Sequence, residues 1–141
     1  MKIVDANVLL YAVNTGSAHH VASRSWLDDA LSADESVGFA WPVMLAFVRI
    51  STMASVFPRP LSAEQAVATA QDWLAQPSAV VVEPDIRHLA VLGGLLATTG
   101  AGGNLVADAH LAAIAVERGA EIVSYDTDFA RFEGVRWTTP G

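Results

Sequence analysis

An α/β fold is predicted, in which helices cover both faces of a mostly parallel β-sheet of four to five strands. Short apolar segments rich in Val and Ile alternate along the chain with longer segments that show helical spacing of apolar residues. The strand segments are apolar throughout, which is typical of parallel strands buried on both faces. The chain has 141 residues and no internal repeat or linker, so residues 1–141 are expected to form a single domain.

Each strand is predicted from a short apolar run that ends in polar or turn-forming residues. The five segments are residues 1–5, 37–40, 79–82, 121–125 and 135–137. The helices between them are predicted from capping residues and helical spacing. They are residues 7–14, a helix capped by Ser17, residues 43–54 after Pro42, residues 62–75, a helix that follows Asp85 and runs to about Thr99, residues 104–117 before Gly119, and a short turn at 129–132. In the second helix, Val21, Leu27 and Leu31 are expected to face the core.

Composition excludes several classes of protein and of site. Eight Lys and Arg residues against fifteen Asp and Glu residues give a formal net charge of -7, the reverse of the balance in proteins that coat nucleic acid by neutralising phosphates. The absence of cysteine excludes disulfides, thiolate zinc sites and cysteine nucleophiles. The longest apolar run, residues 37–48, is interrupted by Gly38 and Pro42 and is too short to span a membrane. We therefore expect a cytoplasmic protein without a secretory signal.

Acidic side chains are expected to gather at the carboxyl edge of the predicted sheet. Asp5 ends the first strand, and Asp126 and Asp128 follow the fourth. Asp108 lies in the helix just before that strand, one turn after Asn104. Carboxyl ends of parallel strands line a common crevice, and clustered carboxylates repel unless a cation such as Mg²⁺ compensates. The sequence therefore predicts a site for metal-dependent phosphodiester chemistry, in which the ion polarises a phosphoryl oxygen and activates a water for in-line attack.

Each of these residues also has a purely structural interpretation. Asp5 precedes a helix that it is able to cap, and Asp126 and Asp128 belong to a residue type common in turns. Asp108 is harder to explain in this way, because a mid-helix aspartate among alanines and leucines is costly unless it faces a polar site. His110 lies two positions further, about 200° around the helix, and is therefore predicted to be peripheral to the site.

Four segments, in the order found in a known family, span nearly the whole chain. They are Ile3–Tyr11, Phe47–Thr52, Gly103–Ala113 and Ile122–Phe132. On these segments the chain resembles the PIN-domain ribonucleases, and within them the VapC-type toxins of bacterial toxin–antitoxin pairs, in an actinobacterial, mycobacterial-like branch. The resemblance implies a PIN-like three-layer α/β/α fold.

The resemblance also implies an activity, a cofactor and partners. Such toxins cleave RNA endonucleolytically with Mg²⁺, or with Mn²⁺ in its place. A structured RNA such as tRNA or rRNA is the implied substrate, a homodimer the implied assembly, and a cognate VapB-type antitoxin the implied partner. By position, the resemblance makes Asp5, Asp108 and Asp126 the catalytic and metal-binding acids, with Asn7, Asn104 and Asp128 in support. Candidates for contacts to RNA phosphates are Arg49 and Arg24, with Arg59 and Arg131 as further candidates.

One position departs from the family pattern and keeps a second interpretation open. The family usually has Glu on the third helix, one turn before Arg49, and this chain has Ala46 there. The pocket is therefore expected to bind one ion more readily than two, and a catalytically degenerate PIN-like subunit that acts only through protein binding remains an alternative. Proteins that phosphorylate an aspartate fit poorly. Their phosphatase class requires Asp where Asn7 stands, and receiver domains require a late lysine, whereas Lys2 is the sole lysine.

Overall fold

Five parallel strands form the sheet in the computed structural model, which describes all 141 residues. The strands are β1 (Lys2–Val4), β2 (Val37–Ala40), β3 (Ala79–Val82), β4 (Glu121–Val123) and β5 (Trp137–Thr138). Their order across the sheet is β3-β2-β1-β4-β5, and every neighbouring pair is parallel. The α/β class and the parallel sheet predicted from the sequence are confirmed.

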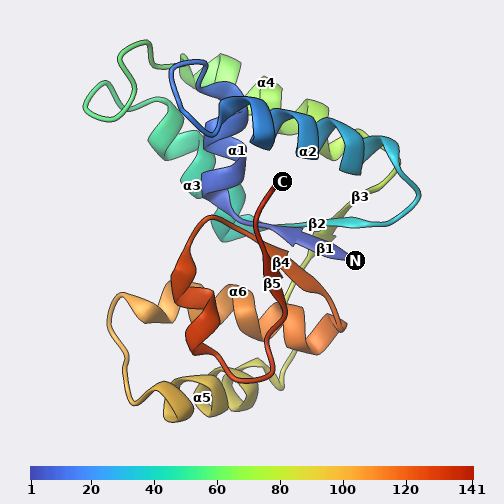
Figure 1. Cartoon of the computed structure of the whole chain (residues 1–141), viewed down its shortest axis with the longest axis vertical. Coiled ribbons are helices and arrows are strands. Elements are labelled where there is room, and N and C mark those ends of the chain that lie inside the picture. The colour runs from blue at the N-terminus through green and yellow to red at the C-terminus, as the bar shows by residue number, and fades with distance from the viewer.

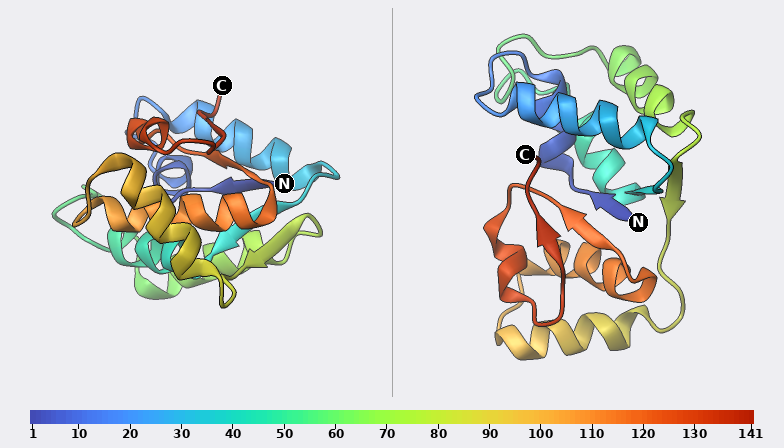
Figure 2. Two further views of the ribbon diagram at one scale, coloured as in Figure 1. Left: turned by 90° about the horizontal axis from the view of Figure 1, so that it is seen from below. Right: turned by 45° about the vertical axis from the view of Figure 1, so that its right-hand side comes forward.

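Two groups of helices flank this sheet. They are α1 (Ala6–Val13), α2 (His20–Ser32), α3 (Trp41–Ser51), α4 (Ala63–Leu74), α5 (His88–Thr99) and α6 (Leu105–Arg118), followed by the 3₁₀ helix η1 (Thr127–Arg131). Figure 1 shows α1–α4 in the upper half of the molecule and α5, α6 and η1 in the lower half. The right-hand view of Figure 2 shows the same separation. None of the helices combines the length and the apolar character needed to cross a membrane.

Strand β1, at the centre of the sheet, and its neighbour β4 are buried in the core. Ile3 and Val4 of β1, and Ile122 and Val123 of β4, have no exposed surface. Buried residues of α1, α3 and α6 belong to the same apolar cluster, and each fully buried side chain of this size contributes about 1.5–3 kcal/mol to folding. The ends of β1 and β4 are therefore held firmly, which fixes the residues that follow them.

Local signals determine where the helices that border this edge begin and end. The Asp5 carboxylate accepts a hydrogen bond from the Ala6 amide at the start of α1. Pro42 lies in the first turn of α3, where its missing N–H leaves no bond unmade. Gly119 ends α6 with a φ of 62°, which glycine adopts without strain, so that β4 begins two residues later.

The second helix differs from the prediction at its start. It begins at His20 rather than directly after Ser17, because the Ser17 hydroxyl accepts a hydrogen bond from the His19 amide within a turn. Val21, which was expected in the core, is 74% exposed, because it lies about 240° around the helix from Leu27 and outside the buried row of Ser23, Leu27 and Leu31.

Further boundaries differ by two or three residues. α3 ends at Ser51 instead of residue 54. β4 ends at Val123, two residues early, because the Tyr125 amide donates to the Asn7 side chain instead of to a neighbouring strand. β5 begins at Trp137, so that the predicted segment 135–137 overlaps it by one residue. The chain thus leaves the sheet at the point where the acidic residues of η1 begin.

Candidate metal centre

Strand register places Asp5 beside a serine that sequence reasoning missed. Val4 of β1 pairs with Val123 of β4, so the next residues along, Asp5 and Ser124, are neighbours. The Ser124 hydroxyl donates to Asp5 Oδ2 at 2.6 Å. The sequence signal for Ser124 is a hydroxyl residue that directly follows an apolar strand segment.

Ser124 connects several groups of the site although it has no exposed surface. Its Oγ accepts hydrogen bonds from Asn7 Nδ2 and from the Asp126 amide, both at 3.0 Å. Asn7 Nδ2 also lies 3.4 Å from Asp5 Oδ2, and Asn7 Oδ1 accepts from the Tyr125 amide at 3.1 Å. The structure thus brings the predicted residues Asp5, Asn7 and Asp126 together through one buried hydroxyl.

Asp5 acts both as a helix cap and as an acid of the site. Its Oδ1 accepts the Ala6 amide at 2.8 Å and caps α1, while its Oδ2 accepts from Ser124. Burial raises the pKa of Asp5, the hydrogen bonds from Ser124 and Ala6 lower it, and the charge of Asp126 raises it, with a net upward shift. A cation beside this carboxylate would relieve the cost of its burial.

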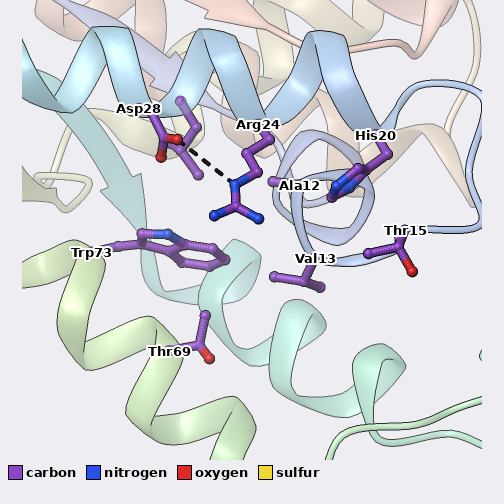
Figure 3. A pocket seen from close by; sticks show the side chains of 9 residues that line it. Ala12, Val13, Thr15, His20, Arg24, Asp28, Thr69 and Trp73 are labelled. Atoms are coloured by element: carbon purple, nitrogen blue, oxygen red, sulfur yellow. Dashed lines mark ion pairs between the residues drawn. The ribbon is translucent and has the colours of Figure 1, made fainter.

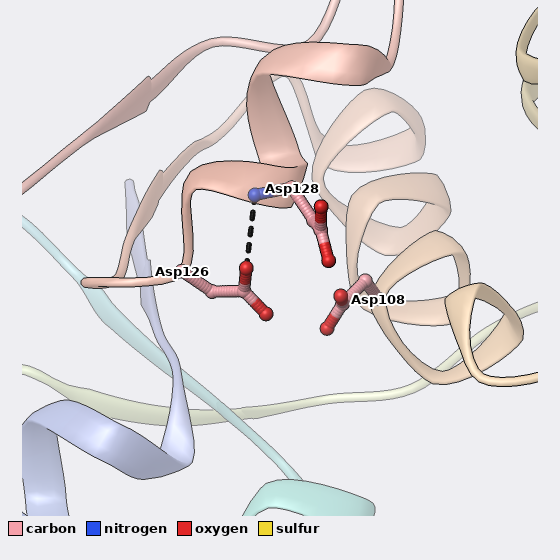
Figure 4. A group of neighbouring side chains, drawn as sticks. All are labelled: Asp108, Asp126 and Asp128. Carbon is pink, nitrogen blue, oxygen red and sulfur yellow. Dashed lines mark hydrogen bonds between the residues drawn. The ribbon is translucent and has the colours of Figure 1, made fainter.

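Asp108, Asp126 and Asp128 form a second group of side chains. Figure 4 shows their carboxyl groups pointing toward one another, Asp108 from α6 and the other two from the start of η1. One carboxylate oxygen of each lies within 4.8 Å of the other two. The Asp128 amide donates to Asp126 Oδ1 at 2.9 Å, so the turn-forming role of Asp126 occupies one of its two oxygens.

The positive charge near these acids is sparse. Arg131 Nη1 lies 3.9 Å from Asp128 Oδ1, and the two side chains are 48% and 50% exposed. Burial, and then the charge of Asp126, raises the pKa of Asp108 to about 7. Three carboxylate oxygens gathered around one centre are the donor set that Mg²⁺ and Mn²⁺ accept. The residues therefore fit a divalent cation.

A cavity of about 120 Å³ adjoins the acids on the side of α3. Asp5, Asp108 and Ala46 line it, so the position without the usual family glutamate opens directly toward the site. His110 lines the same cavity, but its ring is not among the ligand atoms that gather at the acids. Its peripheral role stays a prediction.

His110 is held by a series of hydrogen bonds to side chains of α5 and α6. Its Nδ1 lies 2.8 Å from His88 Nε2, and His88 Nδ1 lies 3.0 Å from Glu117 Oε2. Burial, and then the neighbouring His88, lowers the pKa of His110. These hydrogen-bonded side chains tie α5 to α6.

Three other predicted residues lie outside the acidic cluster. Asn104 is exposed at the start of α6, and its side chain makes no hydrogen bond. Arg49 is exposed in the last turn of α3 and forms no ion pair. Arg24 lies on α2, with its Nε 3.8 Å from Asp28 Oδ2.

Known proteins share both the fold and the sequence pattern. A family model described as the PIN domain matches residues 2–135. This chain belongs to the PIN-domain family. The chain is 62% identical over 140 residues to Ribonuclease VapC37 of Mycobacterium tuberculosis. This match covers 99% of the chain and 97% of the relative. The chain is 41% identical to Ribonuclease VapC33 of the same species, over 99% of this chain and 98% of the relative. The resemblance inferred from the four segments is confirmed.

Solved structures show the same architecture. The crystal structure of VapBC2 from Rickettsia felis bound to a DNA fragment from their promoter matches with a TM-score of 0.72 and 15% identity, over 98% of this chain and 97% of that chain. The crystal structure of Mycobacterium tuberculosis VapC20, described as a Sarcin-Ricin loop cleaving toxin, matches with a TM-score of 0.67 and 20% identity, over 96% and 99%. The PIN-like fold expected from the sequence is confirmed.

Proposed function

We propose that this PIN domain is the toxin of a type II toxin–antitoxin pair and acts as a metal-dependent endoribonuclease. The observation that carries the proposal is the convergence of Asp5, Asp108 and Asp126 on one edge of the sheet, with Asp128 beside them. The 62% identity to a protein named as a ribonuclease supports the same activity.

The acids would hold a divalent ion. Asp5, Asp108 and Asp126 would bind Mg²⁺, or Mn²⁺ in its place, with Asp128 in support. When bound, such an ion polarises a phosphoryl oxygen and lowers the pKa of a water molecule. Because Ala46 supplies no carboxylate to the adjoining cavity, one ion is expected in preference to two.

The residues of the chain orient the reacting groups. Ser124 and Asn7 fix the Asp5 carboxylate, and the Ser124 hydroxyl also fixes the Asp126 backbone. This rigidity aligns an RNA phosphodiester for in-line attack by water. The P–O3′ bond breaks, which leaves a 5′-phosphate and a 3′-hydroxyl, so 2′,3′-cyclic phosphate ends would contradict the mechanism.

The substrate and the partners follow from the relatives. One structural neighbour is described as cleaving the sarcin–ricin loop, and others are VapBC complexes. We therefore propose a structured RNA, either rRNA or tRNA, as the substrate, and a cognate VapB-type antitoxin as the partner. We also propose that the toxin is a homodimer in the cytoplasm.

A cleavage assay tests the activity. The purified chain is incubated with a sarcin–ricin loop RNA and with total tRNA, in Mg²⁺ or Mn²⁺, beside the variants Asp5→Ala and Asp108→Ala. The matched control is Asp72→Ala, which removes an exposed acid of α4 that forms no ion pair. The unaltered chain and Asp72→Ala are expected to cut at least one RNA, and the two site variants are expected to fail.

Two outcomes would overturn the proposal. If the unaltered chain cuts no RNA in either metal, the non-catalytic alternative gains support. If Asp5→Ala and Asp108→Ala cut as well as Asp72→Ala, the acids are not the catalytic centre.

A further inference from the structure

The eight basic residues of the chain fall into two groups. Four are held within the fold: Lys2 by Glu121, Arg87 by Asp85, Arg118 by the Glu83 carbonyl, and Arg136 by the Gly119 carbonyl. The other four are free or have only a long ion pair: Arg24, Arg49, Arg59 and Arg131. In a chain with a net charge of -7, the location of these free guanidinium groups shows where an anion can bind.

Two of the free arginines line a continuous track of three cavities along α1. The first cavity, of about 170 Å³, is lined by Asn7, Tyr11 and Phe57. The second, of about 260 Å³, contains Arg59, and the third, of about 340 Å³, contains Arg24. We call this track the α1 groove.

Shared walls join the three cavities end to end. Asn14 and Phe57 line both the first and the second cavity. Val13 and Thr15 line both the second and the third. The α1 groove is therefore one path along the helix that follows Asp5.

One residue links the groove to the candidate metal centre. Asn7, which lines its first cavity, donates to Ser124 and contacts Asp5. A polymer whose scissile phosphate lies at the acids therefore meets Asn7 first, then Arg59, and then Arg24. This order places two cations beyond the reaction centre, on the side toward which one end of the strand would extend.

The three cavities combine aromatic, polar and cationic lining residues. Tyr11, Phe57 and Trp73 each line part of the groove. Figure 3 shows the Arg24 guanidinium pointing into the third cavity between Trp73 and Val13. Asp28 is the single acid among the lining residues of the three cavities.

We propose that the α1 groove binds the single-stranded RNA that flanks the scissile phosphate, with Arg59 and Arg24 each bound to a phosphate. The proposal rests on the proposed ribonuclease function and specifies how its substrate is held. It commits the groove to RNA, a polyanion, because two of its cavities each contain an arginine and Asp28 is the single acid along it. A protein segment is the competing occupant.

Salt dependence of RNA binding tests the proposal. Binding of 5′-fluorescein-labelled octauridylate is measured by fluorescence anisotropy over a series of salt concentrations, with the full chain carrying Asp108→Asn to prevent turnover. Arg24→Gln and Arg59→Gln are added singly and together. The matched control is the pair Arg118→Gln and Arg136→Gln, whose arginines bond carbonyl groups of the fold.

The groove variants are expected to change the slope of log K against log[salt]. Each lost phosphate contact reduces the slope by about 0.7 for single strands, so the double groove variant is expected to lose about 1.4. The control pair is expected to keep the slope of its parent. Circular dichroism spectra of all variants are expected to agree, because Arg24 is 66% exposed and Arg59 is also exposed.

An unchanged slope in the double groove variant, or an equal loss in the control pair, would overturn the proposal. An unchanged slope in the double groove variant would favour a protein segment as the occupant of the groove. Failure of the groove proposal is distinguishable from failure of the proposed function. If the unaltered chain cuts RNA while the slope is insensitive to Arg24 and Arg59, only the groove proposal fails. If the slope changes as expected while no RNA is cut, only the ribonuclease function fails.

Discussion

The acidic site consists of two halves that are built in opposite ways. In the first, Asp5, Asn7 and Ser124 satisfy one another with hydrogen bonds between buried or half-buried groups. We call it the bonded half. In the second, the repelling half, Asp108, Asp126 and Asp128 face one another with one long ion pair at the rim. The comparison teaches that hydrogen bonds fix the first half of the site, whereas the charges of the second half have no comparable partner within the chain and are expected to be compensated by a cation.

The largest expected effect is loss of cleavage when the repelling half has no cation. Because a divalent ion contributes several kcal/mol of charge stabilisation in such a reaction, chelation with EDTA is expected to slow cleavage by about 10³-fold or more. Gel analysis of RNA cleavage measures this, and added Mn²⁺ is expected to restore it. Cleavage that persists in EDTA would show that the acids work without a metal.

The bonded half is expected to contribute to stability, and two buried serines provide a matched test. Ser124 and Ser51 both have no exposed surface, but the Ser51 hydroxyl has no hydrogen-bond partner. Ser124→Ala is expected to lower the free energy of unfolding by about 1–3 kcal/mol, because Asn7 and Asp5 lose a partner. Ser51→Ala is expected to change it little. Urea titration measures both, and equal effects would remove the distinction between the two halves.

The repelling half is expected to make stability depend on pH when no metal is present. The folded chain keeps a proton on Asp108, whose pKa is raised from 3.8 to about 7, and the unfolded chain releases it. Folding stability in EDTA is therefore expected to fall as pH rises from about 4 to about 7. Allowing for solvent screening, the loss is about 1–2 kcal/mol.

Urea titrations across this pH window measure the effect. Asp108→Asn has no proton to lose at this position, so its stability is expected to vary less with pH than that of the unaltered chain. Parallel pH profiles of the two proteins would contradict the assignment of the shift to Asp108.

The smallest expected effect concerns Ala46. Ala46→Glu adds a carboxylate to the cavity that Asp5 and Asp108 share, and a further charged oxygen ligand raises cation affinity. We expect Mn²⁺ to bind about fivefold more tightly, on the order of 1 kcal/mol. Isothermal titration calorimetry measures this, with Ala46→Gln as the uncharged control. Equal affinities of the two variants would show that the cavity is not part of the metal site.

The sequence predicts one half of the site better than the other. The acids of the repelling half are recognisable because Asp108 stands in an apolar helix and Asp126 follows a buried strand. The bonded half depends on the register between β1 and β4, which joins residues 119 positions apart. No local pattern encodes that pairing, and Ser124 was therefore missed.

The fold shows the same division between local and long-range signals. Capping and apolar spacing place α4 and α6 within about one residue of their predicted bounds, because these signals act within a helix. The start of α2 and the end of β4 depend instead on a turn at Ser17 and on the Asn7 side chain. The cavity that His110 shares with Asp5 and Asp108 likewise lies between residues of α3 and α6, which are far apart in the sequence.

Metal titration tests the central claim most directly, namely that the repelling half holds a divalent cation. Mn²⁺ is titrated calorimetrically into the unaltered chain, Asp108→Asn and the control Asp72→Asn at pH 7.5. We expect one ion to bind to the unaltered chain and to Asp72→Asn, and Asp108→Asn to bind at least tenfold more weakly, which corresponds to about 1.4 kcal/mol. Equal binding by all three proteins, or no binding by the unaltered chain, would contradict the account.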